Sequence, residues 1–187
     1  MSELAHLRLM AGYNTWMNQK LYQAAATLPA HELVAERGAF FGSLIGTLNH
    51  LVAGDTIWLR RFATHPARFG ALDPVLALPA PSGLDAVYSA DLAVLGTHRR
   101  MLDAVIGAWT AQLANADLDH VLHYASTKGI RSQKRFGDLL LHFFNHQTHH
   151  RGQASTLLSQ AGVDLGVTDL LMLIENVADH GAPPAPP

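Results

Sequence analysis

Long runs of apolar residues at helical spacing constrain this chain more than any other feature of its sequence. Over residues 4–28, mostly apolar side chains recur at steps of three and four residues, at Leu4, Leu7, Met10, Ala11, Asn14, Met17, Leu21 and Ala24. This spacing places them on one face of an α-helix. Pro29 ends the helix because proline has no amide hydrogen to donate and its ring clashes with the preceding turn.

The same periodicity returns in three further segments. Ser43 is a suitable N-cap for a second helix over about 43–63. A third long helix is expected over about 84–114, because the stretch 82–85 resembles a capping box with aspartate in place of glutamate. A fourth is expected over about 136–160.

The segments between these helices have different patterns. Residues 64–83 are rich in proline and predict a long loop, whereas 118–134 alternate around a Lys-Gly turn and predict a small hairpin. A shorter helix is expected over about 168–178, followed by a disordered proline-rich tail at 181–187. The chain therefore predicts a single all-α domain over 1–180, built as a four-helix bundle with one long loop, an inserted hairpin and a short C-terminal helix.

Composition excludes several functional classes. Charged residues make up only 15% of the 187 residues, the net charge is −2 and no lysine- or arginine-rich run occurs, so a nucleic-acid partner is not expected. The absence of cysteine removes disulfides, thiolate ligands and a cysteine nucleophile together. No signal peptide and no membrane-spanning stretch is visible, which predicts a soluble cytoplasmic protein without a membrane partner.

Histidines are concentrated in the fourth predicted helix. His146 and His150 are four residues apart, so both lie on one helix face and can reach a single metal ion. His142 and His146 have the same spacing, so this geometry leaves two candidate pairs, and His149 cannot replace His150 in either. Spacing alone is not specific in a chain with twelve histidines, since solvated polar residues on a helix give the same pattern.

A pair of histidines needs a third ligand from another helix. His50 is the best candidate because it lies in mid-helix among apolar neighbours, where an unpaired imidazole is costly. The equally weighted alternative is a core histidine bonded to a carbonyl or a side chain. Gln147 stands where a zincin has its general-base glutamate, so a metalloprotease of that type is disfavoured. No general base is convincing, and catalytic residues stay unassigned among Tyr13, Asn14, Asp55 and Asp138.

Three segments resemble one known family. The stretches "AGYNTWMNQKLYQA", "GTLNHLVAGDTIWLRRF" and "LLLHFFNHQTHHRGQASTLL" are similar, in this order, to the DinB family of DinB/YfiT-like metalloenzymes, and the resemblance covers residues 3–165. It implies a four-helix bundle with an unusual connection order. It also implies a three-histidine metal site formed by His50, His146 and His150, with His142 in a secondary or surface role.

The resemblance also implies a chemistry. Three imidazoles leave a coordination position open, which suits a metal-dependent enzyme with zinc, or alternatively nickel, as its divalent ion. We expect a small-molecule substrate, such as a low-molecular-weight thiol, and a thiol-dependent S-transferase or a hydrolase as the activity. The alternative is a non-catalytic metal-binding or stress-response protein.

Assembly is a further expectation, because family members that resemble this chain are often homodimers packed through bundle helices. A twofold interface would use the same patch on both subunits. The outward faces of the first and third long helices are free of expected ligands, so the candidate contact residues are Leu92, Leu95 and Trp109. Packing of these residues in the core of one subunit is the competing interpretation.

Overall fold

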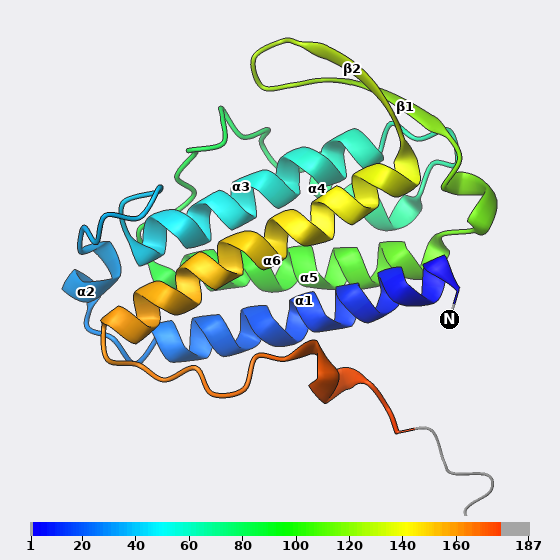
Figure 1. Ribbon diagram of the computed structural model, residues 1–187. Coiled ribbons are helices and arrows are strands. Elements are labelled where there is room, and N and C mark those ends of the chain that lie inside the picture. The colour runs from blue at the N-terminus through cyan, green and yellow to red at the C-terminus, as the bar shows by residue number, and fades with distance from the viewer. Residues whose placement is uncertain (1, 177–187) are drawn as a thin grey trace, which may run out of the picture.

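Four long helices lie side by side in the computed structural model, which describes residues 2–176 (Figure 1). They are α1 (Glu3–Ala25), α3 (Leu44–Phe62), α5 (Leu92–Gln112) and α6 (Phe136–Gln160). The predicted all-α bundle is confirmed, and α6 has the bounds that its periodicity predicts. None of the helices in the described part of the chain combines the length and the apolarity needed to cross a membrane.

The bundle connects its helices in an order that differs from a simple up-and-down arrangement. The main contacts of α1 are with α5 and α6, and the main contacts of α3 are with the same two helices. Consecutive long helices α1 and α3 therefore lie diagonally opposite, as do α5 and α6. As a result, α3 and α6 are neighbours although the third long helix separates them in sequence, and this brings the histidines of both segments to one face.

Short elements occupy the connections. They are α2 (Ala30–Val34), the 3-10 helix η1 (Gly70–Leu72), α4 (Asp73–Leu76), the 3-10 helix η2 (Asn115–Asp117), β1 (Val121–Ala125), β2 (Arg131–Arg135) and the 3-10 helix η3 (Leu170–Leu173). The predicted hairpin is confirmed, since β1 and β2 pair antiparallel and stand above α3 in Figure 1. Within 168–176, the described part of the range where a helix was expected over 168–178, only the four-residue η3 forms. The predicted tail at 181–187 lies outside the described residues.

The third long helix begins later than the capping-box pattern at 82–85 predicted. Asp91 is its N-cap, with a carboxylate oxygen that accepts from the amides of Ala93 at 2.7 Å and Val94 at 3.2 Å. The residues before it run over α3 instead, where the side-chain oxygen of Asn49 accepts from the amide of Tyr88 at 2.7 Å. This tertiary contact outweighs the local sequence preference for a helix that begins near residue 84.

An aromatic cluster fills the end of the bundle below the hairpin. The ring of Phe62 stacks on Trp109 with centroids 5.2 Å apart, and Phe136 meets Phe62 edge-on at 5.4 Å. Trp109 and Leu95 are fully buried in the hydrophobic core of the bundle, so their side chains do not lie on the outward faces where the sequence placed a subunit contact. Leu92 is partly buried and packs against the same core.

A buried polar network crosses the middle of the bundle. One carboxylate oxygen of Asp55 accepts from Nη1 of Arg99 at 2.5 Å and from Nε2 of Gln147 at 2.9 Å. Arg99 also pairs with Asp103, whose carboxylate accepts from the side-chain amide of Asn14. Charged groups with almost no exposure persist in a core only when they are paired, so these contacts fix how α1, α3, α5 and α6 pack together.

Candidate metal centre

The first imidazole of the site comes from α3. Ser43 caps this helix by accepting from the amide of Gly46, and His50 follows two turns later. Its Nδ1 lies 2.7 Å from the carbonyl oxygen of Leu84, in the segment that runs over α3. A carbonyl only accepts, so Nδ1 carries the hydrogen and Nε2 keeps its lone pair. The ring of Phe41 stacks on His50 with centroids 3.8 Å apart and holds its plane.

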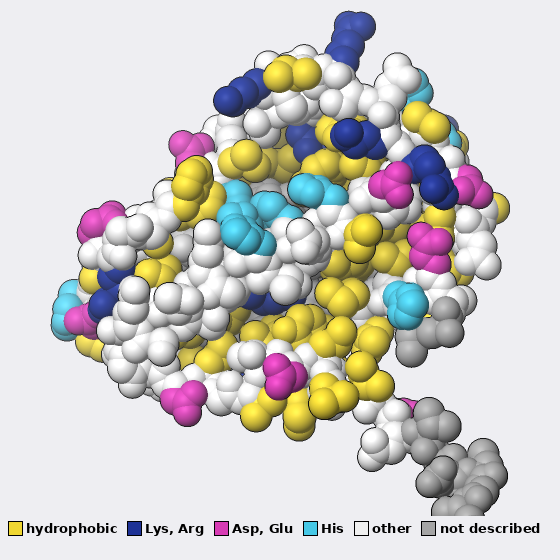
Figure 2. Space-filling view, in the orientation of Figure 1, with side chains coloured by type: hydrophobic (Ala, Val, Ile, Leu, Met, Phe, Trp, Pro, Cys, Tyr) yellow, Lys and Arg dark blue, Asp and Glu magenta, His cyan; other side chains and the backbone are white. Residues whose placement is uncertain are grey.

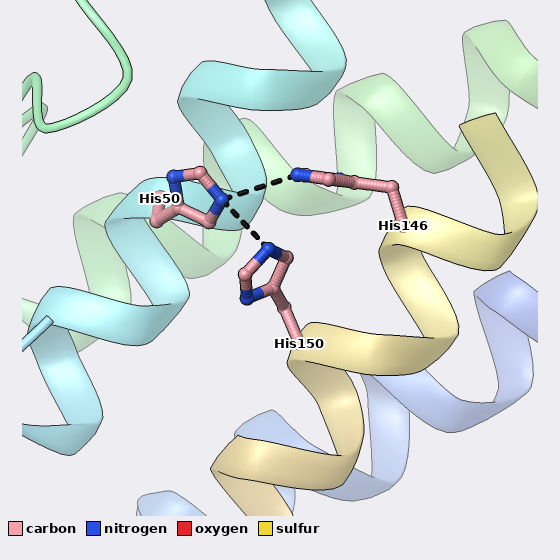
Figure 3. A group of neighbouring side chains, drawn as sticks. All are labelled: His50, His146 and His150. Carbon is pink, nitrogen blue, oxygen red and sulfur yellow. Dashed lines mark hydrogen bonds between the residues drawn. The ribbon is translucent and has the colours of Figure 1, made fainter. Parts of the chain in front are cut away.

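The other two imidazoles come from α6. His146 and His150 lie on the face of this helix that meets α3, as their spacing predicts (Figure 3). Nδ1 of His150 lies 2.7 Å from Oε1 of Gln153, which accepts its hydrogen and again leaves Nε2 unprotonated. The contact with Gln153 therefore orients the ring of His150. Partners of this kind fix the tautomer of metal-binding histidines in many proteins.

The three side chains converge through their Nε2 atoms. Nε2 of His50 lies 3.0 Å from Nε2 of His150 and 3.2 Å from Nε2 of His146, the two approaches drawn in Figure 3. Because His50 and His150 hold their hydrogens on Nδ1, these two Nε2 atoms are both acceptors and cannot bond to each other. Two nitrogens bound to one tetrahedral zinc ion lie about 3.3 Å apart, from the usual bond lengths, so the cluster has dimensions that fit such an ion.

Burial keeps the three imidazoles neutral. Burial and, to a smaller extent, the neighbouring histidines lower the pKa of His146 to about 3 and the pKa of His150 to about 4. The pKa of His50 is also lowered, mainly by burial. Neutral imidazole is the form that binds a metal ion, so the site is ready for one at neutral pH.

A glycine on α3 makes room for the middle imidazole. A Cβ atom at Gly54 would lie 3.0 Å from Cε1 of His146, closer than ordinary van der Waals contact. Gly54 is one turn after His50 on α3, so its bare backbone lets the ring of His146 lie against this helix.

The cluster contains three ligands and no carboxylate. Among the residues that the structure describes, no Asp, Glu or further His joins His50, His146 and His150. His142 stands outside, with its ring centroid 5.9 Å from that of His146. A divalent ion held there would keep at least one coordination position free, which is typical of catalytic rather than structural zinc sites.

The general-base candidates have other roles. Asp55 is fully buried in the polar network, and Asn14 binds Asp103 and Arg151 in the same network. The hydroxyl of Tyr13 donates to the carbonyl oxygen of Thr168 at 2.7 Å. Asp138 is exposed at the start of α6. None of these four belongs to the histidine cluster, so the catalytic residues stay unassigned.

The cluster lies just below the surface: His146 is partly exposed, whereas His50 and His150 are buried. Figure 2 shows histidine side chains gathered on the face formed by α3 and α6, with hydrophobic side chains beside them and basic side chains toward the hairpin.

Comparison with known proteins agrees with this geometry. Residues 1–180 match the DinB family. The chain belongs to the DinB family. Protein DinB of Bacillus subtilis (strain 168) is 25% identical over 162 residues, and the match covers 84% of this chain and 87% of that protein. The resemblance of the three sequence stretches is thus confirmed, and the chain is a DinB-family helical bundle with a three-histidine cluster that could hold a metal ion.

Proposed function

We propose that this protein is a metal-dependent enzyme that transfers a low-molecular-weight thiol to an electrophilic carbon. The observation that supports the proposal most directly is the convergence of three neutral imidazoles on one point, two of them fixed with Nε2 unprotonated by Leu84 and Gln153. A divalent metal ion bound there would lower the pKa of a thiol from a second molecule and keep its sulfur ionised.

The residues around the cluster favour a thiol over water as the nucleophile. Metal-assisted hydrolysis in the zincins uses a glutamate general base beside the metal, and no carboxylate joins the three histidines in the described part of the chain. A free thiol has a pKa of about 8.5 and water one of about 15.7, so a thiol needs far less assistance. Because the chain has no cysteine, the thiol comes from a cosubstrate.

The protein's own side chains position this reaction. Phe41 and the carbonyl of Leu84 hold His50, and Gln153 holds His150, so the open side of the cluster faces a fixed direction. With an aryl chloride as electrophile, a sulfur–carbon bond forms, chloride leaves with the electron pair of the broken carbon–chlorine bond, and the thiol proton passes to solvent.

The proposed metal is zinc, with nickel as the alternative, because imidazole ligands suit both ions. Metal analysis of protein purified without an affinity tag identifies the ion. We expect about one equivalent for each chain, removed by EDTA and lost in His146→Ala. His31→Ala, at an exposed histidine of α2, should retain the metal.

Activity is tested by mixing the metal-loaded protein with a thiol and 1-chloro-2,4-dinitrobenzene and following the conjugate by absorbance. We expect a rate above that of the uncatalysed reaction for wild type and for His31→Ala, and none for His146→Ala or for the EDTA-treated protein. If metal is bound but no physiological thiol gives such a rate, the transferase proposal is wrong and a non-catalytic metal-binding role replaces it.

A further inference from the structure

Arg61, near the end of α3, is a partly buried cation that has no carboxylate partner in the described part of the chain. Its Nη2 donates to the carbonyl oxygen of Ala125 at 2.9 Å, and its guanidinium lies 4.7 Å from the ring centre of Trp58 and 5.0 Å from that of Tyr124. Among the described residues it forms no ion pair, whereas Arg37, Arg99 and Arg135 each pair with an acidic side chain.

The missing partner has an energetic consequence. Burial lowers the pKa of Arg61, which means that the protein destabilises its charged form. An anion that docks on the guanidinium would compensate this cost, and a charged hydrogen bond in a partly desolvated place is stronger than one in water. The bond to Ala125 uses only one of the five N–H donors of the side chain, so donors remain for a ligand.

Arg61 lies on the same stripe of α3 as the histidine cluster. It follows His50 by three helical turns, which is roughly 16 Å of axial rise. Arginine side chains on a helix lean toward its N-terminus, so the guanidinium reaches back toward the cluster. Rings line the surface between Arg61 and the histidine cluster. The ring centroid of His142 lies 5.9 Å from that of His146 and 5.0 Å from that of Trp58.

This surface carries positive charge. Arg61 and Lys134, which stands on β2, both lower the pKa of His142 after the larger effect of burial. No carboxylate contributes to the shift of His142 or of Arg61. Figure 2 shows the same arrangement, with basic side chains between the histidines and the hairpin above them. A strip with a ring-lined floor and cations at one end complements an elongated molecule with an anionic end.

We propose that Arg61, assisted by Lys134, binds the carboxylate of an elongated thiol whose sulfur reaches the three-histidine cluster. This inference rests on the proposed function and specifies its substrate class. Because the side chain of Arg61 leans back along α3, the distance left between its guanidinium and the three-histidine cluster is on the order of 10 Å. This distance matches a molecule of about three peptide units. The ring-lined floor, chiefly His142 and Trp58, contacts the body of the molecule.

The test compares two ligands that differ only in charge. The probes are N-acetyl-cysteinyl-glycyl-glycine with a free C-terminal carboxylate and the same peptide with a C-terminal amide, titrated calorimetrically into the metal-loaded protein. We expect the acid to bind wild type about tenfold more tightly than the amide, the worth of one charged hydrogen bond. Arg61→Gln should remove this preference and leave the affinity for the amide and the metal content unchanged.

Two further variants exclude a purely structural effect. Arg61→Lys retains a cation and should keep most of the preference for the acid. Arg100→Gln changes an exposed arginine of α5, whose Nη2 donates to Thr97, and should keep all of it. Equal binding of acid and amide to wild type, or a preference that survives in Arg61→Gln, overturns the proposal. If Arg61 instead affects only reactions in which the electrophile carries the carboxylate, the assignment to the thiol is wrong.

A second readout separates this inference from the proposed function. In the metal-free protein, the Nε–Hε NMR signal of Arg61, assigned by its loss in Arg61→Gln, is followed during addition of a thiol-free peptide, N-acetyl-alanyl-glycyl-glycine. We expect the acid to shift this signal and the amide to leave it in place. If thiol transfer fails but this shift occurs, the anion site stands without the proposed chemistry, and an unchanged signal overturns the anion site itself.

Discussion

The ring of His146 packs directly against Gly54, on the neighbouring helix, at a place where a single added methyl group would lie 3.0 Å from Cε1. The position of this imidazole therefore depends on the missing side chain of a residue that is not itself a ligand.

Gly54→Ala should weaken metal binding without weakening the fold. Alanine is favoured over glycine in a helix by about 1 kcal/mol, but its methyl group would displace the ring of His146. We expect metal affinity to fall about tenfold or more, measured by competition with a chelator, while the melting temperature of the metal-free protein stays the same or rises. Gly107→Ala is the matched control, because a Cβ there contacts nothing within 4 Å. An unchanged affinity in Gly54→Ala would contradict the role given to this glycine.

Gln153→Leu should also lower metal affinity. The change removes the acceptor that holds the Nδ1 hydrogen of His150 at 2.7 Å, and loss of such a partner typically costs ten- to a hundredfold in affinity. Competition with a chelator again measures the effect. Thr156→Ala, an exposed position one turn later, should bind metal like wild type. Equal affinities in the two variants would show that Gln153 does not orient the imidazole.

The metal-free protein should lose stability in mild acid. The folded state holds the pKa of His146 at about 3 and that of His150 at about 4, whereas both lie near 6.5 in the unfolded chain. Below about pH 6.5 the unfolded state therefore binds more protons, and the free energy of unfolding falls until the pH reaches the folded-state values. Above this range the two histidines contribute no pH dependence.

Urea denaturation at about pH 7 and about pH 5, in the presence of EDTA, measures this effect. The double variant His146→Ala with His150→Ala lacks both groups and should show a smaller loss between the two pH values. The same loss in wild type and in the double variant would mean that other groups cause it.

Asp55→Ala should strongly destabilise the bundle. The change leaves the buried guanidinium of Arg99 without one of its two carboxylates and leaves the amide of Gln147 without an acceptor. Breaking a buried pair in this way costs about 3–5 kcal/mol. Asp119→Ala removes the partner of the exposed Arg135 and should cost less than about 1 kcal/mol. Urea denaturation of both variants compares them, and similar costs would show that the network contributes little.

Periodicity predicted the long helices because their apolar faces are their dominant local property. It failed at the start of α5, where the segment before Asp91 is held by contacts with Asn49 and His50 that come from a distant part of the chain. The short α2 and α4 were also missed, since helices of so few residues have too little periodicity to be detected. The expected homodimer stays a prediction, which light scattering of untagged protein tests.

Spacing on α6 could suggest the site, but it left two histidine pairs open, and the family resemblance chose between them. Gln153 was within reach of sequence reasoning, because it follows His150 by three residues on a helix and therefore faces it. The carbonyl of Leu84 and the ring of Phe41 were not, because both lie on irregular segments whose position no local pattern encodes.

Adjacent residues of α6 serve opposite sides of the protein: His146 and His150 face the cluster, while Gln147 and Arg151 are buried in the polar network. Each residue advances a helix by about 100°. Insertion of one residue near the start of α6 would therefore move His146 to the place where the amide of Gln147 meets Asp55. The same insertion would move Asn145 to the ligand position of His146. The three-histidine cluster and the buried polar network would then be disrupted together. The stretch of α6 from its start to Arg151 should therefore keep its length among proteins that keep this site, while the turn of the hairpin before it can gain or lose residues freely.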